Sequence, residues 1–259
     1  MSTHSLAYDD EGVGPVVVLL HAFPCDRNMW GPQASALTAA GYRVIRPDLP
    51  GFGASTTHAT DDPSLDLMAQ DVLDLLDAID VPEFVLGGLS MGGYVSMALL
   101  RMAPERVRAL ILADTKATDD AEPARAVRYG SAEQVLAAGS TQPVAETMLQ
   151  GLLGPTSRAH RPEAVGAARS WLSNARPESF AWAQRAMAVR PNSLPTLAAF
   201  ARPALVLWGT EDALSPQPEQ EAMLAALPAG TEARLEAAGH LTAVEVPDEV
   251  SKALLSFLG

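Results

Sequence analysis

Short runs of β-branched and leucine residues alternate with helix-forming stretches along the first half of the chain, and this alternation restricts its fold most. The run PVVVLLH (15–21) is apolar almost throughout, as expected for a strand buried on both faces. A helix-forming stretch (31–40) is closed by Gly41, and YRVIRPD (42–48) follows as a second strand. Strand–helix–strand units of this kind build parallel sheets, so we predict an α/β fold with a mostly parallel central sheet.

The alternation continues to about residue 117. Between Leu65 and Ile79 apolar residues recur every three or four positions and aspartates fill the opposite face, which predicts a helix that covers the sheet. Next come a predicted strand (84–88), a helix over about 92–102 that ends before Pro104, and a strand, VRALILAD, at 107–114.

The pattern changes between residues 118 and 200, where strand runs vanish and alanine-rich stretches take their place. Several of these stretches begin at or just after a proline, which suits the first turn of a helix: Pro143, Pro162 and Pro177. Strand and helix patterns resume at 203–209, 218–227, 232–236 and 247–258. We therefore predict a core of residues 1–117 and 201–259 and a helical insertion of residues 118–200.

Composition excludes several classes of function. Eighteen Lys and Arg against 31 Asp and Glu give a formal net charge of −13, which disfavours nucleic acid and anionic membranes as partners. One cysteine, Cys25, excludes an intramolecular disulfide, and no Cys/His cluster predicts a metal site. The first apolar run, Val16–Leu20, is too short for a signal peptide or a membrane span. We expect a soluble, cytoplasmic protein that is a monomer or homodimer and uses neither metal nor cofactor.

The sequence Gly88-Leu89-Ser90-Met91-Gly92 lies between a predicted strand and a predicted helix. Small residues on both sides of Ser90 permit a sharp reversal of the chain, which holds the serine in a strained position beyond the end of the strand. The helix start behind it offers free backbone N–H groups for an oxyanion. The alternative is a glycine-rich packing turn; the strand-to-helix context favours a nucleophile.

These features resemble the α/β-hydrolase superfamily over essentially the whole chain. The resemblance rests on segments in a fixed order: LLHAFP, DLPGFGAS, GLSMGG, LVLWGTEDALSP and AAGH. It implies the α/β-hydrolase fold with a helical cap inserted after the sixth core strand. In that superfamily the partners of the nucleophile follow in the order acid, then histidine.

A serine hydroxyl needs a base and the base needs an orienting carboxylate. His240, which follows Gly239 near the C-terminus, fits the base, and Asp212 in GTED stands where the resemblance implies the acid. Asp114 is the rival acid, because some relatives carry it after the earlier strand. Glu211 and Glu245 are interpreted as solvated or loop-bonded carboxylates, and the remaining histidines have no predicted role in the chemistry: His4, His21, His58 and His160.

The resemblance assigns the oxyanion hole to the backbone amides of Met91 and Phe23. In the loop after the first strand run, which contains Phe23, the residue that is usually glycine in the family is here Ala22. The change is tolerated because the donor is a backbone amide and not a side chain. Cys25 lies near this loop but lacks the strand-to-helix turn and a neighbouring base, so we interpret it as a packing residue. Asp48 resembles a structural turn residue of the family.

A cap needs an apolar underside, and part of it is expected to form a substrate pocket. Candidate substrate-binding residues are the large apolar side chains of the insertion: Met148, Trp171, Trp182 and Met187. For each of them the alternative is ordinary packing of a helix face.

The predicted function is hydrolysis of carboxylic esters of small to medium apolar substrates through an acyl-enzyme on Ser90. Two variants use the same residues: a lactonase similar to 3-oxoadipate enol-lactonases, and a perhydrolase in which peroxide replaces water. The alternative of another class is a low-turnover ligand receptor on the same fold. Nothing predicts nucleotide use, because no glycine-rich phosphate-binding motif follows a strand.

Overall fold

The computed structural model describes residues 6–57 and 62–259, so His4 and His58 lie outside the described residues. Its centre is a seven-stranded sheet of order β1-β3-β2-β4-β5-β6-β7, in which β1 is antiparallel to β3 and all other neighbours are parallel. The α/β-hydrolase fold class is confirmed. The strands are β1 (Tyr8–Glu11), β2 (Val16–Leu20), β3 (Arg43–Pro47), β4 (Phe84–Leu89), β5 (Val107–Ala113), β6 (Ala204–Gly209) and β7 (Gly230–Leu235).

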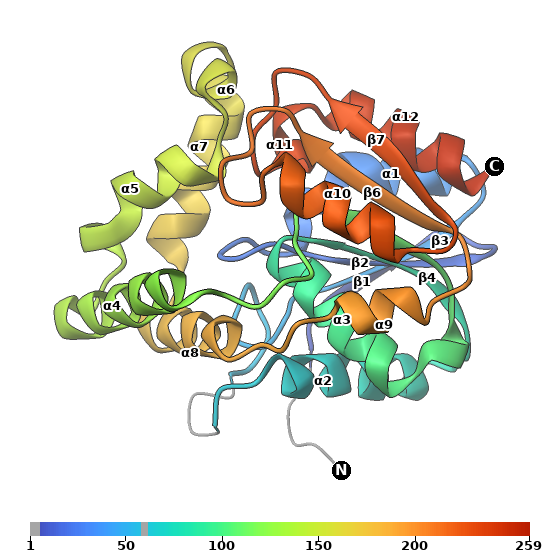
Figure 1. Cartoon of the computed structure of the whole chain (residues 1–259), viewed down its shortest axis with the longest axis horizontal. Helices are drawn as coiled ribbons and strands as arrows, with labels where there is room; N and C mark the ends of the chain where they lie inside the picture. Colours follow the sequence, from blue (N-terminus) through green and yellow to red (C-terminus); the bar gives the residue numbers. More distant parts are fainter. Residues whose placement is uncertain (1–5, 58–61) are drawn as a thin grey trace.

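Both faces of the sheet are covered by helices (Figure 1). Alternate residues of β2 point to opposite sides, so Val18 and Leu20 join one buried cluster, with Val72 and Leu99, while Val17 and Leu19 join the other. The first cluster lies under α2 (Leu65–Ala78), α3 (Met91–Met102) and α10 (Gln217–Ala226); the second lies under α1 (Gly31–Ala39) and α12 (Pro247–Leu258). The continuous apolar runs that predicted doubly buried strands are thus explained.

The edge strand β1 is not predicted from the sequence, because YDDE has no apolar pattern. It pairs with β3 through the backbone, and ion pairs join the same two strands: Arg43 with Asp10 and Arg46 with Glu11. Charged side chains along an exposed edge also discourage pairing with another chain.

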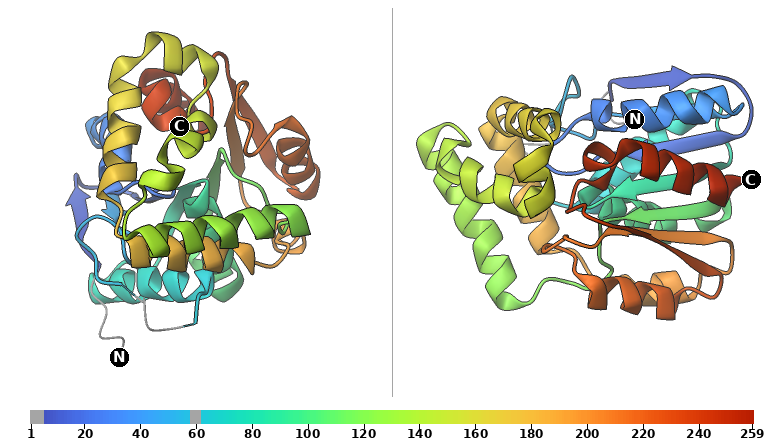
Figure 2. Two further views of the ribbon diagram at one scale, coloured as in Figure 1. Left: turned by 90° about the vertical axis from the view of Figure 1, so that its left-hand side faces the viewer. Right: turned by 90° about the horizontal axis from the view of Figure 1, so that it is seen from above.

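Between β5 and β6 the chain is helical, and five of these helices gather beyond the carboxyl ends of the strands (Figures 1 and 2). Among the described strands, the insertion lies between β5 and β6. The sixth helix, α9 (Leu194–Ala198), packs instead on α3 and α10. The gathered helices are α4 (Glu122–Ala138), α5 (Gln142–Leu152), α6 (Pro155–His160), α7 (Pro162–Asn174) and α8 (Pro177–Ala188).

The segments that enter and leave the insertion lie side by side. Ser193 N donates to Ala117 O at 2.7 Å, and the Arg190 guanidinium pairs with the buried carboxylate of Asp120 at 2.8 Å. Arg190 also lies 4.1 Å from the ring centre of Tyr94 on α3. Burial acts to raise the pKa of Asp120, but the surrounding guanidinium groups outweigh it and lower the pKa. These contacts tie both ends of the insertion to the helix that follows β4.

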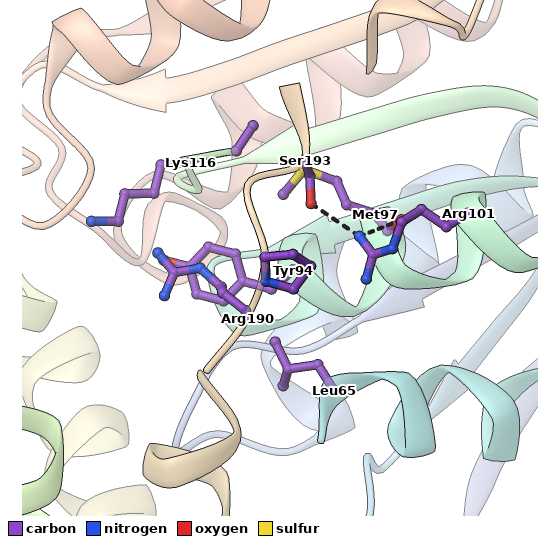
Figure 3. A pocket seen from close by; sticks show the side chains of 9 residues that line it. Leu65, Tyr94, Met97, Arg101, Lys116, Arg190 and Ser193 are labelled. Atoms are coloured by element: carbon purple, nitrogen blue, oxygen red, sulfur yellow. Dashed lines mark hydrogen bonds between the residues drawn. The ribbon is translucent and has the colours of Figure 1, made fainter. Parts of the chain in front are cut away.

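The cavity beside these segments is small (Figure 3). Its volume is about 10 Å³, room for one water molecule at most. Tyr94, Lys116 and Arg190 line it, and Arg101 Nη1 donates to Ser193 Oγ across 3.0 Å. The cavity is therefore too small for an organic substrate.

Three short helices complete the described chain: two 3₁₀ turns, Arg27–Trp30 before α1 and Pro104–Arg106 before β5, and α11 (Thr242–Glu245) before α12. Within residues 6–57 and 62–259, every helix is too short or too polar to cross a bilayer.

Candidate active site

Ser90 occupies the turn between β4 and α3 with φ 55° and ψ −113°, a left-handed conformation that L residues rarely adopt. The flanking glycines permit the turn by their lack of a side chain. A Cβ on Gly88 would lie 2.2 Å from Gly92 O, and one on Gly92 would lie 2.2 Å from Leu20 O. The backbone is fixed further because Ser90 N donates to Ala113 O at 2.9 Å. The motif therefore does what the sequence predicts: it places Ser90 at the carboxyl edge of the sheet.

Ser90, His240 and Asp212 form one hydrogen-bonded chain, although they come from three separate loops. Ser90 Oγ lies 2.7 Å from His240 Nε2, and His240 Nδ1 lies 2.9 Å from Asp212 Oδ2. The three residues are 8%, 3% and 6% exposed, so the chain is shielded from bulk water. Low local dielectric strengthens such bonds.

Asp212 is held as an acceptor by the loop after β6. Its Oδ1 accepts from the backbone N–H of Leu214 and Ser215, and its Oδ2 accepts from Ser215 Oγ as well as facing His240. Burial acts to raise the pKa of Asp212, but the charge of His240 and these hydrogen bonds outweigh burial and lower the pKa below its ordinary value. The carboxylate is therefore ionised at neutral pH.

Asp114, the rival acid, does not contact His240. Its Oδ1 accepts from Gly209 N at 3.0 Å, and its Oδ2 accepts from the N–H and hydroxyl of Thr242. Burial, then the neighbouring charge of Asp212, raise the pKa of Asp114 well above its ordinary value. Asp114 thus joins the end of β6 to the loop that carries His240, and Asp212 is the carboxylate on the histidine.

The two residues proposed for the oxyanion hole follow neighbouring parallel strands, Phe23 after β2 and Met91 after β4. Met91 is the first residue of α3, so its N–H has no acceptor within the helix. Phe23 follows β2, before Pro24 in a cis peptide, and its ring lies against two others, with ring centres 5.8 Å from Phe52 and 4.7 Å from Phe180. Phe180 was not predicted as a site residue; its only sequence signal is the apolar spacing of α8.

His21 supports the loop of Phe23 through both ring nitrogens. Nδ1 lies 2.8 Å from Ala22 O, and Nε2 accepts from Leu49 N at 2.8 Å, so the ring is neutral with its proton on Nδ1. The side chain is fully buried, and burial lowers the pKa of His21, against smaller raising effects of its own backbone bond and Asp48.

This neutral histidine predicts acid sensitivity of folding. The unfolded chain binds a proton at His21 below about pH 6.5, whereas the folded chain binds it only at lower pH. The unfolded state therefore holds more protons in that window, and the free energy of unfolding falls as pH drops below about 6.5. Urea titrations at several pH values between about 8 and 5 give the free energy of unfolding as a function of pH. This free energy should fall less steeply with decreasing pH in His21→Asn than in the native chain. An unchanged slope would assign the acid sensitivity to other groups.

The remaining predicted residues lie in or beside the insertion. Trp182 and Met187, on α8, belong to the same buried cluster as Phe23 and Met91. Met148 packs between the two clusters, and Trp171 packs on the second. The structure therefore places these four side chains on the apolar underside of the insertion or between its helices.

A groove of about 400 Å³ lies between the Phe23 loop and the insertion. Cys25, Phe52, Trp171 and Arg176 are among its lining residues, and its volume is in the range of small-ligand sites. Burial raises the pKa of the Cys25 thiol well above its ordinary value, so the thiol is protonated at neutral pH and a poor nucleophile. Of the candidates, Trp171 has the clearest access to this groove.

The carboxylates beside the histidine loop are loop-bonded, as interpreted from the sequence. Glu211 accepts from Thr156 N and Oγ1, and Glu245 accepts from Gly154 N, Gly239 N and Leu241 N. No cluster of metal-ligating side chains occurs within the part of the chain that the structure describes. Asp48 accepts from Arg27 N and Ala54 N and orders the turn after β3.

The chain is similar over nearly its whole length to several known proteins. A thermophilic esterase from Thermogutta terrifontis is 39% identical and superposes with a TM-score of 0.93 over 98% of this chain and 92% of its own. The enol-lactonase of Burkholderia xenovorans is 25% identical, with a TM-score of 0.90 over 98% and 96%. A putative non-heme bromoperoxidase of Mycobacterium tuberculosis is 29% identical over 98% of this chain and 97% of its own. The family model described as alpha/beta hydrolase fold matches residues 15–247, and the chain belongs to that family.

Proposed function

We propose that the protein is a serine hydrolase that cleaves carboxylic esters of small to medium apolar substrates without a cofactor. The observation that carries the proposal is the chain from Ser90 Oγ through His240 to Asp212, with bonds of 2.7 and 2.9 Å. This arrangement supplies nucleophile, base and orienting carboxylate in the order needed for acyl transfer. Similarity to an esterase over nearly the whole chain supports the same reaction.

The proposed reaction has two halves. Ser90 Oγ attacks the ester carbonyl carbon as its proton passes to His240 Nε2, and Asp212 accepts the hydrogen bond from Nδ1–H. The amides of Met91 and Phe23 stabilise the tetrahedral oxyanion, and His240 returns the proton to the leaving alcohol. Water, activated by His240, then hydrolyses the acyl-enzyme and restores Ser90.

The insertion acts as a cap in this proposal. Residues 1–117 and 201–259 carry the catalytic groups, and the insertion within 118–200 covers the carboxyl edge of the sheet (Figure 2). Met148, Trp171, Trp182 and Met187 supply apolar surface for the acyl or alcohol group, with Trp171 at the groove beside the Phe23 loop.

A lactone is the second candidate substrate, because the enol-lactonase has the same fold over 98% of this chain. A ring ester needs the same attack and the same oxyanion hole; the leaving alcohol stays attached to the acyl group. Peroxide in place of water is a third reaction, suggested by the similarity to a protein named as a bromoperoxidase.

Substrate profiling tests the proposal. We expect saturable hydrolysis of p-nitrophenyl esters from acetate to octanoate, at least about 10⁶-fold faster than the uncatalysed reaction. We also expect an organophosphate to label one serine, identified as Ser90 by peptide mass spectrometry. Parallel assays with simple lactones and with hydrogen peroxide rank the three reactions. Turnover near background in all three would favour a ligand receptor and contradict the proposal.

A further inference from the structure

Two glycines place the insertion in direct contact with the loop that carries His240. Gly154, before α6, has φ −62° and ψ 154°, and neither it nor Gly239 has a positive φ, so any residue could adopt either backbone conformation. A Cβ on Gly239 would nevertheless lie 2.1 Å from Gly154 N, and one on Gly154 would lie 2.4 Å from Glu211 Oε2. Both glycines are therefore required by the close approach of the two backbones.

A single buried carboxylate joins the same segments. Glu245 is 3% exposed; its Oε2 accepts from Gly154 N and from Gly239 N, each at 2.9 Å, and its Oε1 accepts from Leu241 N at 3.0 Å. The amides on both sides of His240 and one amide of the insertion thus share one acceptor. Hydrogen bonds to a charged group are stronger than neutral ones.

Two further contacts link the insertion to the catalytic loops. Glu211, which precedes Asp212, accepts from Thr156 N at 2.9 Å and from Thr156 Oγ1 at 2.5 Å. Arg161, after α6, donates to Ala237 O at 2.6 Å, three residues before His240. The segment 154–161 therefore touches the loop of the proposed acid and the loop of the proposed base.

We infer that Glu245 is a positioning residue and that, through it and the Gly154–Gly239 contact, the insertion holds His240 in line with Ser90. The inference rests on the proposed function for its kinetic consequence, and on the hydrogen bonds alone for its structural one. In this proposal residues 154–161 help to position His240, in addition to belonging to the cap over the substrate. Displacing this segment moves the His240 loop.

Substitution on the insertion side tests the coupling. In Gly154→Ala the added methyl group pushes against Glu211 and Gly239 while Glu245 and the whole core keep their sequence. We expect kcat on a p-nitrophenyl ester to fall on the order of 10- to 10²-fold with little change in KM, because misplacement of a catalytic group by a fraction of an ångström slows the chemical step. We expect Glu245→Gln, which turns an acceptor into an amide, to lower kcat at least as much.

Gly166→Ala is the matched control. Gly166 lies in α7 of the same insertion, and a Cβ there meets nothing within 4 Å, so kcat and KM should equal those of the native chain. Hydrogen exchange measured by mass spectrometry over residues 237–243 gives a readout independent of turnover. It should accelerate in Gly154→Ala and Glu245→Gln and stay unchanged in Gly166→Ala.

The outcomes separate the two proposals. Native kcat and native exchange in Gly154→Ala, or a change confined to KM, would overturn the coupling even if Glu245→Gln fails to fold. If the native chain hydrolyses no ester, lactone or peroxide substrate, the proposed function fails, yet the exchange comparison still decides whether the insertion holds the His240 loop.

Discussion

Replacing Ser90 by alanine is expected to lower kcat/KM for p-nitrophenyl acetate on the order of 10³-fold or more, because the attacking oxygen is lost while His240 and the oxyanion amides remain. The fold should survive. The bonds that fix the turn are made by the backbone, since Ser90 N donates to Ala113 O and Ser90 O accepts from Tyr94 N and the Thr115 hydroxyl. Steady-state kinetics at matched circular dichroism and melting temperature measure the effect.

A neighbouring serine provides the control. Ser96 is also buried and lies on α3, where its hydroxyl donates to Gly92 O at 2.8 Å and is remote from His240 in the hydrogen-bond network. Ser96→Ala should lose one local hydrogen bond, about 1 kcal/mol of stability, and keep turnover within a few-fold of native. Turnover retained in Ser90→Ala would place the nucleophile elsewhere.

The second large effect is a difference in kcat between asparagine variants of the two buried aspartates, Asp212 and Asp114. Asp212→Asn is expected to lower kcat on the order of 10⁴-fold, because an amide facing Nδ1 donates a hydrogen bond and leaves the ring proton on Nε2, where it blocks proton transfer from Ser90. The same change at Asp114 should cost less than about tenfold, since Asp114 does not contact His240 and is bonded instead to Gly209 N and Thr242.

Kinetics of the two variants at neutral pH measure this difference, and unfolding at several pH values checks the protonation of Asp114. The unfolded chain ionises Asp114 above about pH 4 while the folded chain keeps the proton, so this group lowers native stability as pH rises through that value. Asp114→Asn removes that decline. A collapse of kcat in Asp114→Asn with native rates in Asp212→Asn would reverse the assignment.

The sequence predicts the fold well because its strands are buried on both faces. Val16–Leu20 and Val107–Ala113 carry almost unbroken apolar runs, which leave few alternatives to a parallel sheet covered by helices. The edge strand Tyr8–Glu11 escapes prediction for the opposite reason: YDDE has no apolar pattern, and its partners on β3, both backbone and charged side chains, cannot be known without the fold.

The candidate site is predicted in part. Ser90 is found because its constraint is local: the glycines that the turn requires lie two residues to either side. The choice between Asp212 and Asp114 is different, since β5 and β6 are parallel neighbours and both carboxylates follow their carboxyl ends. The short loop after β6, in which Asp212 N donates to Gly209 O, places the Asp212 carboxylate and not that of Asp114 against His240. Phe180 packs on Phe23, and Glu245 accepts from Gly154 N as well as from its own loop; Phe23 and Gly154 are distant in the sequence, so local patterns do not reveal these two contacts.

Because Ala117 and Ser193 are adjacent, the helical segment between them can be replaced by another one. Its two ends are joined by a 2.7 Å hydrogen bond, so the core already holds residues 117 and 193 next to each other. A different helical segment inserted between them would have little loop-closure entropy to lose. Such a graft changes the walls around the substrate while the strands stay as they are. A foreign segment must also bring a residue without a side chain opposite Gly239, because the backbones of Gly154 and Gly239 approach closely there.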